Sequence, residues 1–127
     1  MRTDGRSARV LVVDDDKGIR EFVRTVLSDE GYDVAEATDG QQALDRVAQR
    51  RPDVILLDMR MPVMDGWEFA RTYRERPGPH APIVIVTAAL DVAKDAKEIG
   101  ADGFLAKPFQ LDDLLQLVQQ HSAPASP

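Results

Sequence analysis

Four short apolar runs divide this chain, at residues 10–13, 54–57, 83–86 and 104–106. None of them alternates apolar with polar residues, so each run is typical of a strand that is buried on both faces. Strands of this kind belong to parallel sheets that carry helices on both sides. The sequence therefore predicts an α/β fold built on a parallel sheet.

Each apolar run is followed by a polar residue that can take part in chemistry. In chain order these residues are Asp14 with Asp15 and Asp16, then Asp58, then Thr87, and then Lys107. In an open parallel α/β sheet, ligands bind in the crevice outside the carboxyl ends of the strands. We therefore expect the carboxylates, the hydroxyl and the amine to meet at one edge of the sheet, although they are far apart in the sequence.

Apolar residues at helical spacing fill the gaps between the predicted strands and predict five helices. Their expected inward faces, in chain order, are Ile19, Phe22, Val23, Val26 and Leu27; Ala43, Leu44, Val47 and Ala48; Phe69, Ala70 and Tyr73; Val92, Ala93, Ala96 and Ile99; and Leu111, Leu114, Leu115 and Val118. Asp16 and Asp65 are expected to cap the first and third helices. The fourth helix, at about residues 90–98, has a thin apolar face, and residues 32–37 alternate like an edge strand.

Length and composition restrict the class of protein. A chain of 127 residues fits one domain, which we expect at residues 9–121, with an extension at 1–8 and a tail or linker at 122–127. The chain has no cysteine, so a metal would be bound by oxygen or histidine. The net charge of -6 argues against direct binding of nucleic acid. No apolar stretch approaches the roughly 20 residues of a membrane helix, and no signal peptide is visible, so the expected location is the cytoplasm.

The polar residues at the strand ends suit the transfer of a phosphoryl group. Neighbouring carboxylates repel one another unless a cation joins them or one is protonated, and carboxylate oxygens suit Mg²⁺. Lys107 could bind a phosphate oxygen as a point charge, the Thr87 hydroxyl could donate a hydrogen bond, and an aspartate could act as the nucleophile. Taken singly, each residue also has a structural explanation, such as a helix cap for an aspartate or a solvated charge for a lysine.

Four segments together resemble the receiver domain of two-component response regulators. They are residues 12–16, 56–66, 86–88 and 100–109, with the sequences VVDDD, LLDMRMPVMDG, VTA and GADGFLAKPF. The resemblance extends over about residues 8–121, in the order of the family. It implies a flavodoxin-like, doubly wound sheet of five parallel strands in the order 2-1-3-4-5, with five helices.

The resemblance also assigns roles to individual residues. Asp58 is implied to be the phosphoacceptor. The groups implied to hold Mg²⁺ are Asp14, Asp15, Asp58 and the backbone carbonyl of Arg60, with Asp15 as the first choice of direct ligand. The residues implied to bind the phosphoryl group or to carry the switch are Thr87, Ala88, Lys107 and Phe104, the last as the switch aromatic. The bond between Lys107 and Pro108 is implied to be cis.

The implied function is a signalling switch. A histidine kinase or a phosphotransfer protein would donate a phosphoryl group to Asp58. The face made by the fourth helix, the fifth strand and the fifth helix would then change, to control an output protein or a second copy of the chain. Such a domain is not an enzyme, although it catalyses its own phosphorylation and dephosphorylation. Leu117 lies about 110° off the apolar stripe of its helix. It is therefore a candidate contact for the partner, and the alternative is that it packs against the tail.

Three other functions use similar residues. A metal-dependent phosphatase of the haloacid dehalogenase type also forms an aspartyl phosphate, but its first strand ends in Asp-x-Asp, whereas residues 14–16 here are contiguous aspartates. A flavodoxin-like cofactor binder would need a loop rich in hydroxyls and glycine after Val13. A degenerate receiver that serves only in oligomerisation would not need the complete set of site residues.

Two positions are expected to set the lifetime of the phosphorylated form. Arg60 and Ala89 lie two residues beyond Asp58 and Thr87, beside the route by which water would attack the phosphoryl group. Ala89 has no carboxylate or amide to orient that water. Arg60 could lie over the phosphoryl group and obstruct the approach of the water, and the alternative is that it simply points to solvent. We therefore expect a phosphorylated form that is long-lived for a receiver.

Overall fold

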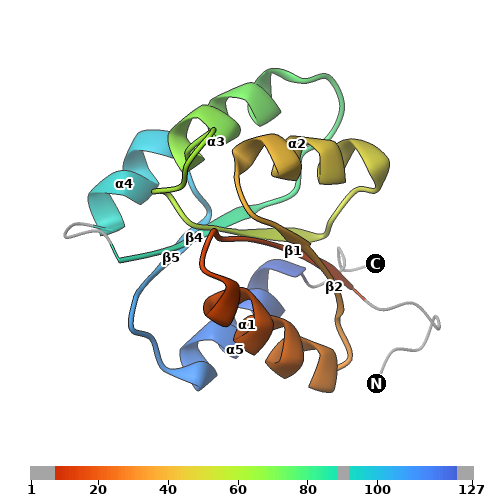
Figure 1. Cartoon of the computed structure of the whole chain (residues 1–127), viewed down its shortest axis with the longest axis vertical. Helices are drawn as coiled ribbons and strands as arrows, with labels where there is room; N and C mark the ends of the chain where they lie inside the picture. Colours follow the sequence, from red (N-terminus) through yellow and green to blue (C-terminus); the bar gives the residue numbers. More distant parts are fainter. Residues whose placement is uncertain (1–7, 89–91, 123–127) are drawn as a thin grey trace.

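The chain folds into a five-stranded parallel sheet with helices on both faces (Figure 1). A computed structural model describes residues 8–88 and 92–122. In chain order its elements are β1 (Arg9–Val13), α1 (Lys17–Asp29), β2 (Asp33–Ala37), α2 (Gly40–Gln49), β3 (Val54–Leu57), α3 (Gly66–Glu75), β4 (Ile83–Thr87), α4 (Val92–Ile99), β5 (Gly103–Ala106) and α5 (Leu111–Ser122). The strand order is β2-β1-β3-β4-β5, so the flavodoxin-like fold expected from the sequence is confirmed.

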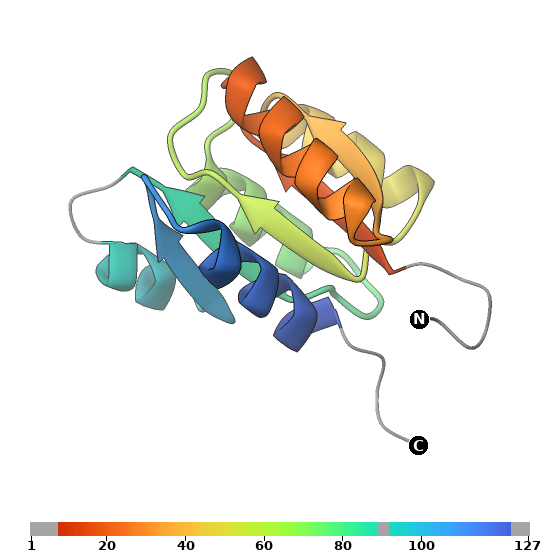
Figure 2. The ribbon, with the colours of Figure 1, turned by 90° about the horizontal axis from the view of Figure 1, so that it is seen from below.

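The sheet separates two layers of helices. α1 and α5 cover one face, and α2, α3 and α4 cover the other (Figures 1 and 2). Alternate residues of each central strand enter two different apolar clusters. In β3, Val54 belongs to the cluster that contains Leu27 of α1, and Ile55 belongs to the cluster that contains Phe69 of α3. Because both faces of the sheet are covered, no position in a central strand has to be polar. This explains the continuous apolar runs in the sequence.

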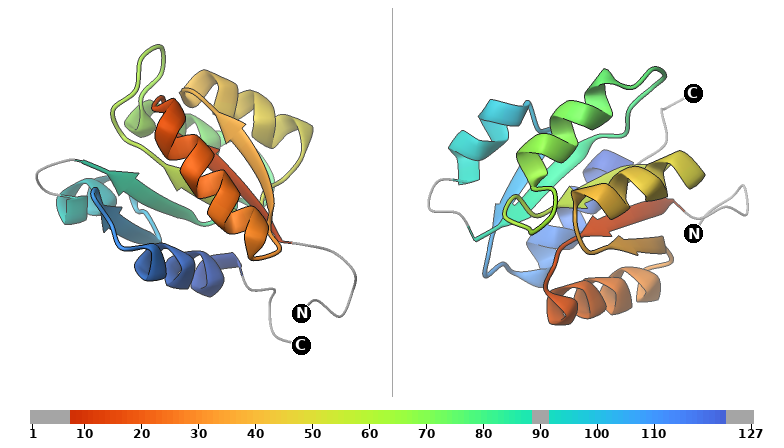
Figure 3. Two further views of the ribbon diagram at one scale, coloured as in Figure 1. Left: turned by 60° about the horizontal axis from the view of Figure 1, so that its bottom comes forward. Right: turned by 45° about the horizontal axis from the view of Figure 1, so that its top comes forward.

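The register of the strands positions the polar residues that follow them. Asp14 and Asp58 directly follow strand residues that pair with each other, so they leave the sheet side by side. Thr87 is the last residue of β4 and pairs with Ala106, which directly precedes Lys107. Since the sheet is parallel, the carboxyl ends of β1, β3 and β4 lie at the same end of the molecule (Figure 3).

Three aspartates cap helices in the described part of the chain. Asp16, Asp39 and Asp65 are the N-caps of α1, α2 and α3, and their side chains accept hydrogen bonds from the backbone three residues on at 3.1, 2.9 and 2.9 Å. A cap of this kind stabilises a protein by about 1 kcal/mol. The prediction of caps at Asp16 and Asp65 is confirmed, so the last of the three consecutive acids after β1 has a structural role.

Several side chains expected to face inward are exposed. Phe22 is 49% exposed and Leu111 is 39% exposed, and Ala48 and Ala93 are exposed as well. A helix that lies on one face of a sheet contacts it along a limited stripe, so residues at the margin of the apolar pattern face solvent. Leu117 differs from its expected position in the opposite way. It was expected to contact a partner, but it is half-buried and packs against the apolar cluster between the sheet and α5.

The ends of the elements also differ in detail from the expectation. Ser122, expected to begin a tail, is the last residue of α5 and is buried. The expected start of the fourth helix at Leu90, like residues 1–7 and 123–127, lies outside the described residues. No helix in the described part of the chain is long and apolar enough to cross a membrane.

Candidate functional site

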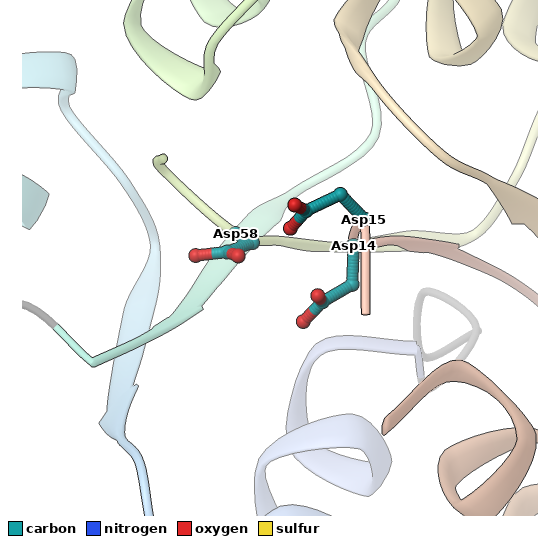
Figure 4. A group of neighbouring side chains, drawn as sticks. All are labelled: Asp14, Asp15 and Asp58. Carbon is teal, nitrogen blue, oxygen red and sulfur yellow. The ribbon is translucent and has the colours of Figure 1, made fainter. Parts of the chain in front are cut away.

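Three carboxylates meet at the carboxyl ends of β1 and β3 (Figure 4). Asp14 and Asp15 follow β1, Asp58 follows β3, and each of the three offers an oxygen within 4.8 Å of the others. Asp14 and Asp58 are only 3% and 7% exposed, whereas Asp15 is exposed. The convergence expected from the sequence occurs because β1 and β3 are hydrogen-bonded neighbours in the sheet.

Lys107 reaches this acid cluster from the end of β5. Its Nζ donates hydrogen bonds to Oδ2 of Asp14 at 2.7 Å and to Oδ2 of Asp58 at 3.5 Å. The ammonium therefore offsets part of the repulsion between the carboxylates. Oδ1 of Asp14 accepts a hydrogen bond from the backbone N–H of Asp16 at 2.9 Å. Both oxygens of Asp14 are thus engaged by the protein, and Asp15 has the carboxylate that is most open to a metal ion.

Thr87 completes the surroundings of Asp58. Its side chain is buried, and its hydroxyl donates a hydrogen bond to Oδ1 of Asp58 at 2.9 Å. The backbone N–H of Asp58 donates to the carbonyl of Val13 at 2.9 Å, which ties the residue to the sheet. One carboxylate oxygen of Asp58 therefore accepts a hydrogen bond from a hydroxyl group, and the other accepts one from an ammonium group.

Burial and charge shift the pKa values of two groups in the cluster. Burial raises the pKa of Asp14, and the charge of Asp58 raises it further, against the lowering effect of the hydrogen bonds from Lys107 and Asp16. Burial alone would lower the pKa of Lys107, but the hydrogen bond to Asp14 and the charges of both carboxylates raise it above its ordinary value. The Lys107 side chain is therefore protonated at neutral pH.

The donor set of the acid cluster fits a hard divalent cation. Asp14, Asp15 and Asp58 offer only carboxylate oxygens, which are the ligands of Mg²⁺ and Ca²⁺. A cation bound there would remove the repulsion that Lys107 offsets only in part. The acid cluster can therefore hold a metal ion.

The other residues named by the resemblance lie on or next to β4 and β5. Phe104 of β5 is 48% exposed, so its ring is on the surface in this structure. Ala88 is exposed directly after β4. The peptide bond between Lys107 and Pro108 is cis. Ala89 lies outside the described residues.

Arg60 is held by an aromatic ring. Its side chain is exposed, and its guanidinium lies over Trp67, 5.4 Å from the ring centroid. Trp67 in turn donates from Nε1 to Oε1 of Glu98 in α4 at 3.1 Å. The expected position of Arg60 over a phosphoryl group on Asp58 stays a prediction. No sequence pattern singles out Trp67, because its partners come from other segments.

Arg20 is a further residue that sequence reasoning missed. It lies in α1, and its guanidinium donates hydrogen bonds to the backbone carbonyl of Asp14 and to the side chain of Glu36 in β2. Only its position in the sequence could have indicated this contact, since an arginine in the first turns of a helix can reach back to the loop before it. This signal is weak, because surface arginines in helices are common.

Comparisons with known proteins point to one family. The family model of the response regulator receiver domain matches residues 10–119, which include every site residue described above. Response regulator MprA of Mycobacterium bovis (strain BCG / Pasteur 1173P2) is 46% identical over 111 residues, which are 86% of this chain and 48% of that protein. MprA of Mycobacterium tuberculosis (strain ATCC 25177 / H37Ra) has the same identity and coverage. The chain spans about half the length of these curated relatives.

Solved structures show the same fold. The chemotaxis response regulator CheY4 of Vibrio cholerae is 40% identical, with a TM-score of 0.82 over 91% of this chain and 98% of that one. The receiver domain of Francisella response regulator 1452 is 32% identical, with a TM-score of 0.83 over 91% of this chain and 97% of that one. Fold, sequence and arrangement of the strand-end residues thus point to the same family.

Proposed function

This chain belongs to the receiver domain family of response regulators, and on this premise we propose that it is a phosphorylation-dependent signalling switch. We assign residues 9–121 to the receiver. A histidine kinase or a phosphotransfer protein in the cytoplasm donates the phosphoryl group, and an output protein or a second copy of the chain responds to it. The family is not a classical enzyme family, and the catalysis we propose is limited to the chain's own phosphorylation and dephosphorylation.

The surroundings of Asp58 are the observation that supports this proposal most strongly. The Thr87 hydroxyl donates a hydrogen bond to one carboxylate oxygen of Asp58 at 2.9 Å, and Nζ of Lys107 lies 3.5 Å from the other oxygen. Both groups can bind oxygens of a phosphoryl group attached to this carboxylate. An aspartate that only capped a helix would need neither of them.

In the proposed reaction, a carboxylate oxygen of Asp58 attacks the phosphorus atom of the donor. A bond forms between this oxygen and phosphorus, and the bond from phosphorus to the leaving group breaks, with the electron pair going to the donor's nitrogen or oxygen. Lys107 offsets charge on the transferred group, and Thr87 donates its hydroxyl to it. Mg²⁺ would offset further charge on the phosphoryl oxygens, held by Asp14, Asp15, Asp58 and the backbone carbonyl of Arg60.

Phosphorylation is proposed to change the face made by α4, β5 and α5. Thr87 would move toward the new phosphoryl oxygens, and the exposed ring of Phe104 would turn into the space that Thr87 leaves. The weak packing of α4 supports this proposal, because Asp95 and Ala96 are its buried residues in the described part of the helix. An element with few buried apolar contacts shifts at low cost in free energy.

Phosphorylation by a small donor tests the assignment of Asp58. The protein is treated with acetyl phosphate and Mg²⁺, and its intact mass is measured. We expect the wild type to gain one phosphoryl group, and Asp58→Asn to gain none. Asp45→Asn, which removes an exposed carboxylate from α2, serves as the matched control and should gain the group as the wild type does. A full gain of mass in Asp58→Asn would refute the assignment.

A second experiment tests the metal ligands. Calorimetric titration with Mg²⁺ should show a large loss of affinity in Asp15→Asn, because Asp15 has the open carboxylate. Asp16→Asn removes a neighbouring charge but keeps a side-chain oxygen for the helix cap, and should leave most of the Mg²⁺ affinity intact. Equal losses of affinity in the two variants would contradict the assignment of Asp15 as a direct ligand.

A further inference from the structure

Arg20, near the start of α1, links the acidic loop (residues 14–16) to the sheet. Its Nη1 donates a hydrogen bond to the backbone carbonyl of Asp14 at 2.8 Å, and its Nε donates to Oε1 of Glu36 at 3.3 Å. The side chain of Arg20 is only 14% exposed. Hydrogen bonds from a charged guanidinium are stronger than those between neutral groups, and its planar shape gives them a defined direction. The carbonyl of Asp14 is therefore held in one orientation.

We infer that Arg20 is a positioning residue for the metal site, an inference that rests on the proposed function. The carbonyl of Asp14 belongs to the planar peptide group that also contains the nitrogen and Cα of Asp15. A hydrogen bond that fixes the direction of this carbonyl therefore also fixes the backbone position from which the Asp15 side chain extends. Arg20 acts on the metal through Asp15 and does not need to touch it.

The other contacts of Asp14 explain why this peptide group matters. The backbone N–H of Asp14 donates to the carbonyl of Ala37 at 3.1 Å, and its two side-chain oxygens accept from Asp16 and Lys107. Asp14, which directly precedes the exposed carboxylate of Asp15, is thus fixed through its backbone nitrogen and its side chain. The contact with Arg20 fixes the remaining polar group, which is the one that leads into Asp15.

Glu36 of β2 holds the guanidinium of Arg20 in place. Its second carboxylate oxygen accepts a hydrogen bond from Nη1 of Arg24 at 3.1 Å. Arg24 is 62% exposed, and in the described chain it has no hydrogen bond to the acidic loop. Arg20 and Arg24 therefore share one glutamate, but only Arg20 contacts the loop that carries Asp15.

Removal of Arg20 would have two opposite effects on metal affinity, one from the loss of its charge and one from the loss of its hydrogen bond. Loss of a positive charge near three carboxylates would raise the affinity for Mg²⁺, because cations repel one another. Loss of the contact with the Asp14 carbonyl would lower it, because Asp15 would no longer be held in the binding geometry. Arg20→Gln and Arg24→Gln remove the same charge beside the same glutamate. A loss of affinity confined to Arg20→Gln therefore reports the positioning of the peptide group.

The experiment measures the dissociation constant of Mg²⁺ by calorimetry for the wild type and three variants, with thermal unfolding in a chelator to show that each is folded. Arg20→Gln should bind Mg²⁺ about tenfold more weakly, the lower end of the range for residues that orient metal ligands. Arg24→Gln should bind it as tightly as the wild type or more tightly. Arg20→Lys keeps the charge but cannot reproduce the planar fork, and should weaken binding about twofold or more.

Each outcome decides between explanations. Equal affinity in the wild type and Arg20→Gln, or equal losses in Arg20→Gln and Arg24→Gln, would overturn the inference. If Arg20→Gln does not fold, Arg20→Lys carries the test, and unchanged affinity in that variant would overturn the inference. A wild type that binds no Mg²⁺ would instead refute the metal site of the proposed function. The two failures are therefore distinguishable.

Discussion

The buried hydroxyl of Thr87 donates a hydrogen bond to Oδ1 of Asp58 at 2.9 Å. Thr87 ends β4, Asp58 follows β3, and the two strands are hydrogen-bonded neighbours. A new group attached to the carboxylate of Asp58 would therefore lie within reach of this hydroxyl. The hydrogen bond connects the proposed phosphoacceptor to β4, which pairs with β5 and lies next to α4.

Thr87→Val is expected to uncouple phosphorylation from the change in surface. Valine matches the shape of threonine but cannot donate a hydrogen bond to a phosphoryl oxygen. Amide hydrogen exchange, measured with and without beryllofluoride and Mg²⁺, should show smaller changes in α4, β5 and α5 of Thr87→Val than in the wild type. Thr87→Ser keeps the hydroxyl and should retain most of the response. A full response in Thr87→Val would show that the hydroxyl is not the switch.

Asp14→Asn is expected to stabilise the metal-free protein at neutral pH, by on the order of 1 kcal/mol in the free energy of unfolding. Burial raises the pKa of Asp14, so the folded protein binds this proton more tightly than the unfolded chain does. The contribution of Asp14 to stability is therefore complete below its ordinary pKa of 3.8 and is lost as the pH rises through the raised value. Asparagine avoids this loss.

Urea unfolding in a chelator, at neutral and at acidic pH, checks the prediction for Asp14. The gain in stability of Asp14→Asn over the wild type should be present at neutral pH and should shrink as the pH falls toward 3.8. A gain that grows toward acidic pH would have the wrong sign. It would mean that the carboxylate of Asp14 stabilises the fold in its ionised form.

Trp67→Leu is expected to lengthen the life of the phosphorylated form. The guanidinium of Arg60 now lies over the Trp67 ring, and its release would allow it to cover the phosphoryl group. An exposed cation–π contact is worth roughly 0.5–1 kcal/mol, so the rate of dephosphorylation should fall by no more than about fivefold. The measurement is the loss of phosphate after the donor has been removed.

Two further variants control the prediction for Trp67. Trp67→Phe keeps an aromatic face for Arg60 but loses the hydrogen bond to Glu98, and should dephosphorylate as the wild type does. Arg60→Asn, which removes the cation, should dephosphorylate faster than the wild type, and Trp67→Leu should have no effect in that background. A slower rate in Trp67→Leu that persists without Arg60 would exclude the proposed mechanism.

Asp95→Ala is expected to stabilise the protein. Asp95 lies in α4 and is 8% exposed, and its Oδ2 has no hydrogen-bond partner in the described structure. A buried polar group without a partner costs roughly 1–3 kcal/mol, and alanine also favours the helix. Chemical unfolding should show a larger gain for Asp95→Ala than for Asp45→Ala, which changes an exposed position inside α2 and gains helix propensity alone. Equal gains would show that the burial of Asp95 costs nothing.

The positions of the polar residues at the strand ends could be predicted from the sequence because the relevant signal is local. An apolar run without alternation identifies a central parallel strand, and the chain direction then places the residue after it at the ligand-binding edge. This reasoning was enough to bring together Asp58, Thr87 and Lys107. It applied equally to the helix cap at Asp16, since a cap depends on neighbours in the chain.

Rotation of the helices could be predicted only in part. The expected stripe on α1 included Phe22, which is 49% exposed, whereas Leu117 of α5 was expected outside and packs against the core. Periodicity gives the apolar side of a helix to within about one residue. Which residue at the margin is covered depends on the neighbouring helix and on the twist of the sheet.

The sequence by itself determined the parallel sheet, its helices and the edge at which the reactive side chains gather, because all of these follow from patterns between residues close in the chain. The tertiary structure decided which atoms meet. It placed Lys107 between Asp14 and Asp58, and Arg20 on the carbonyl that leads into Asp15. Such contacts join separate elements, so they exist only once strand register and helix rotation have been set together by the packing of the two apolar clusters.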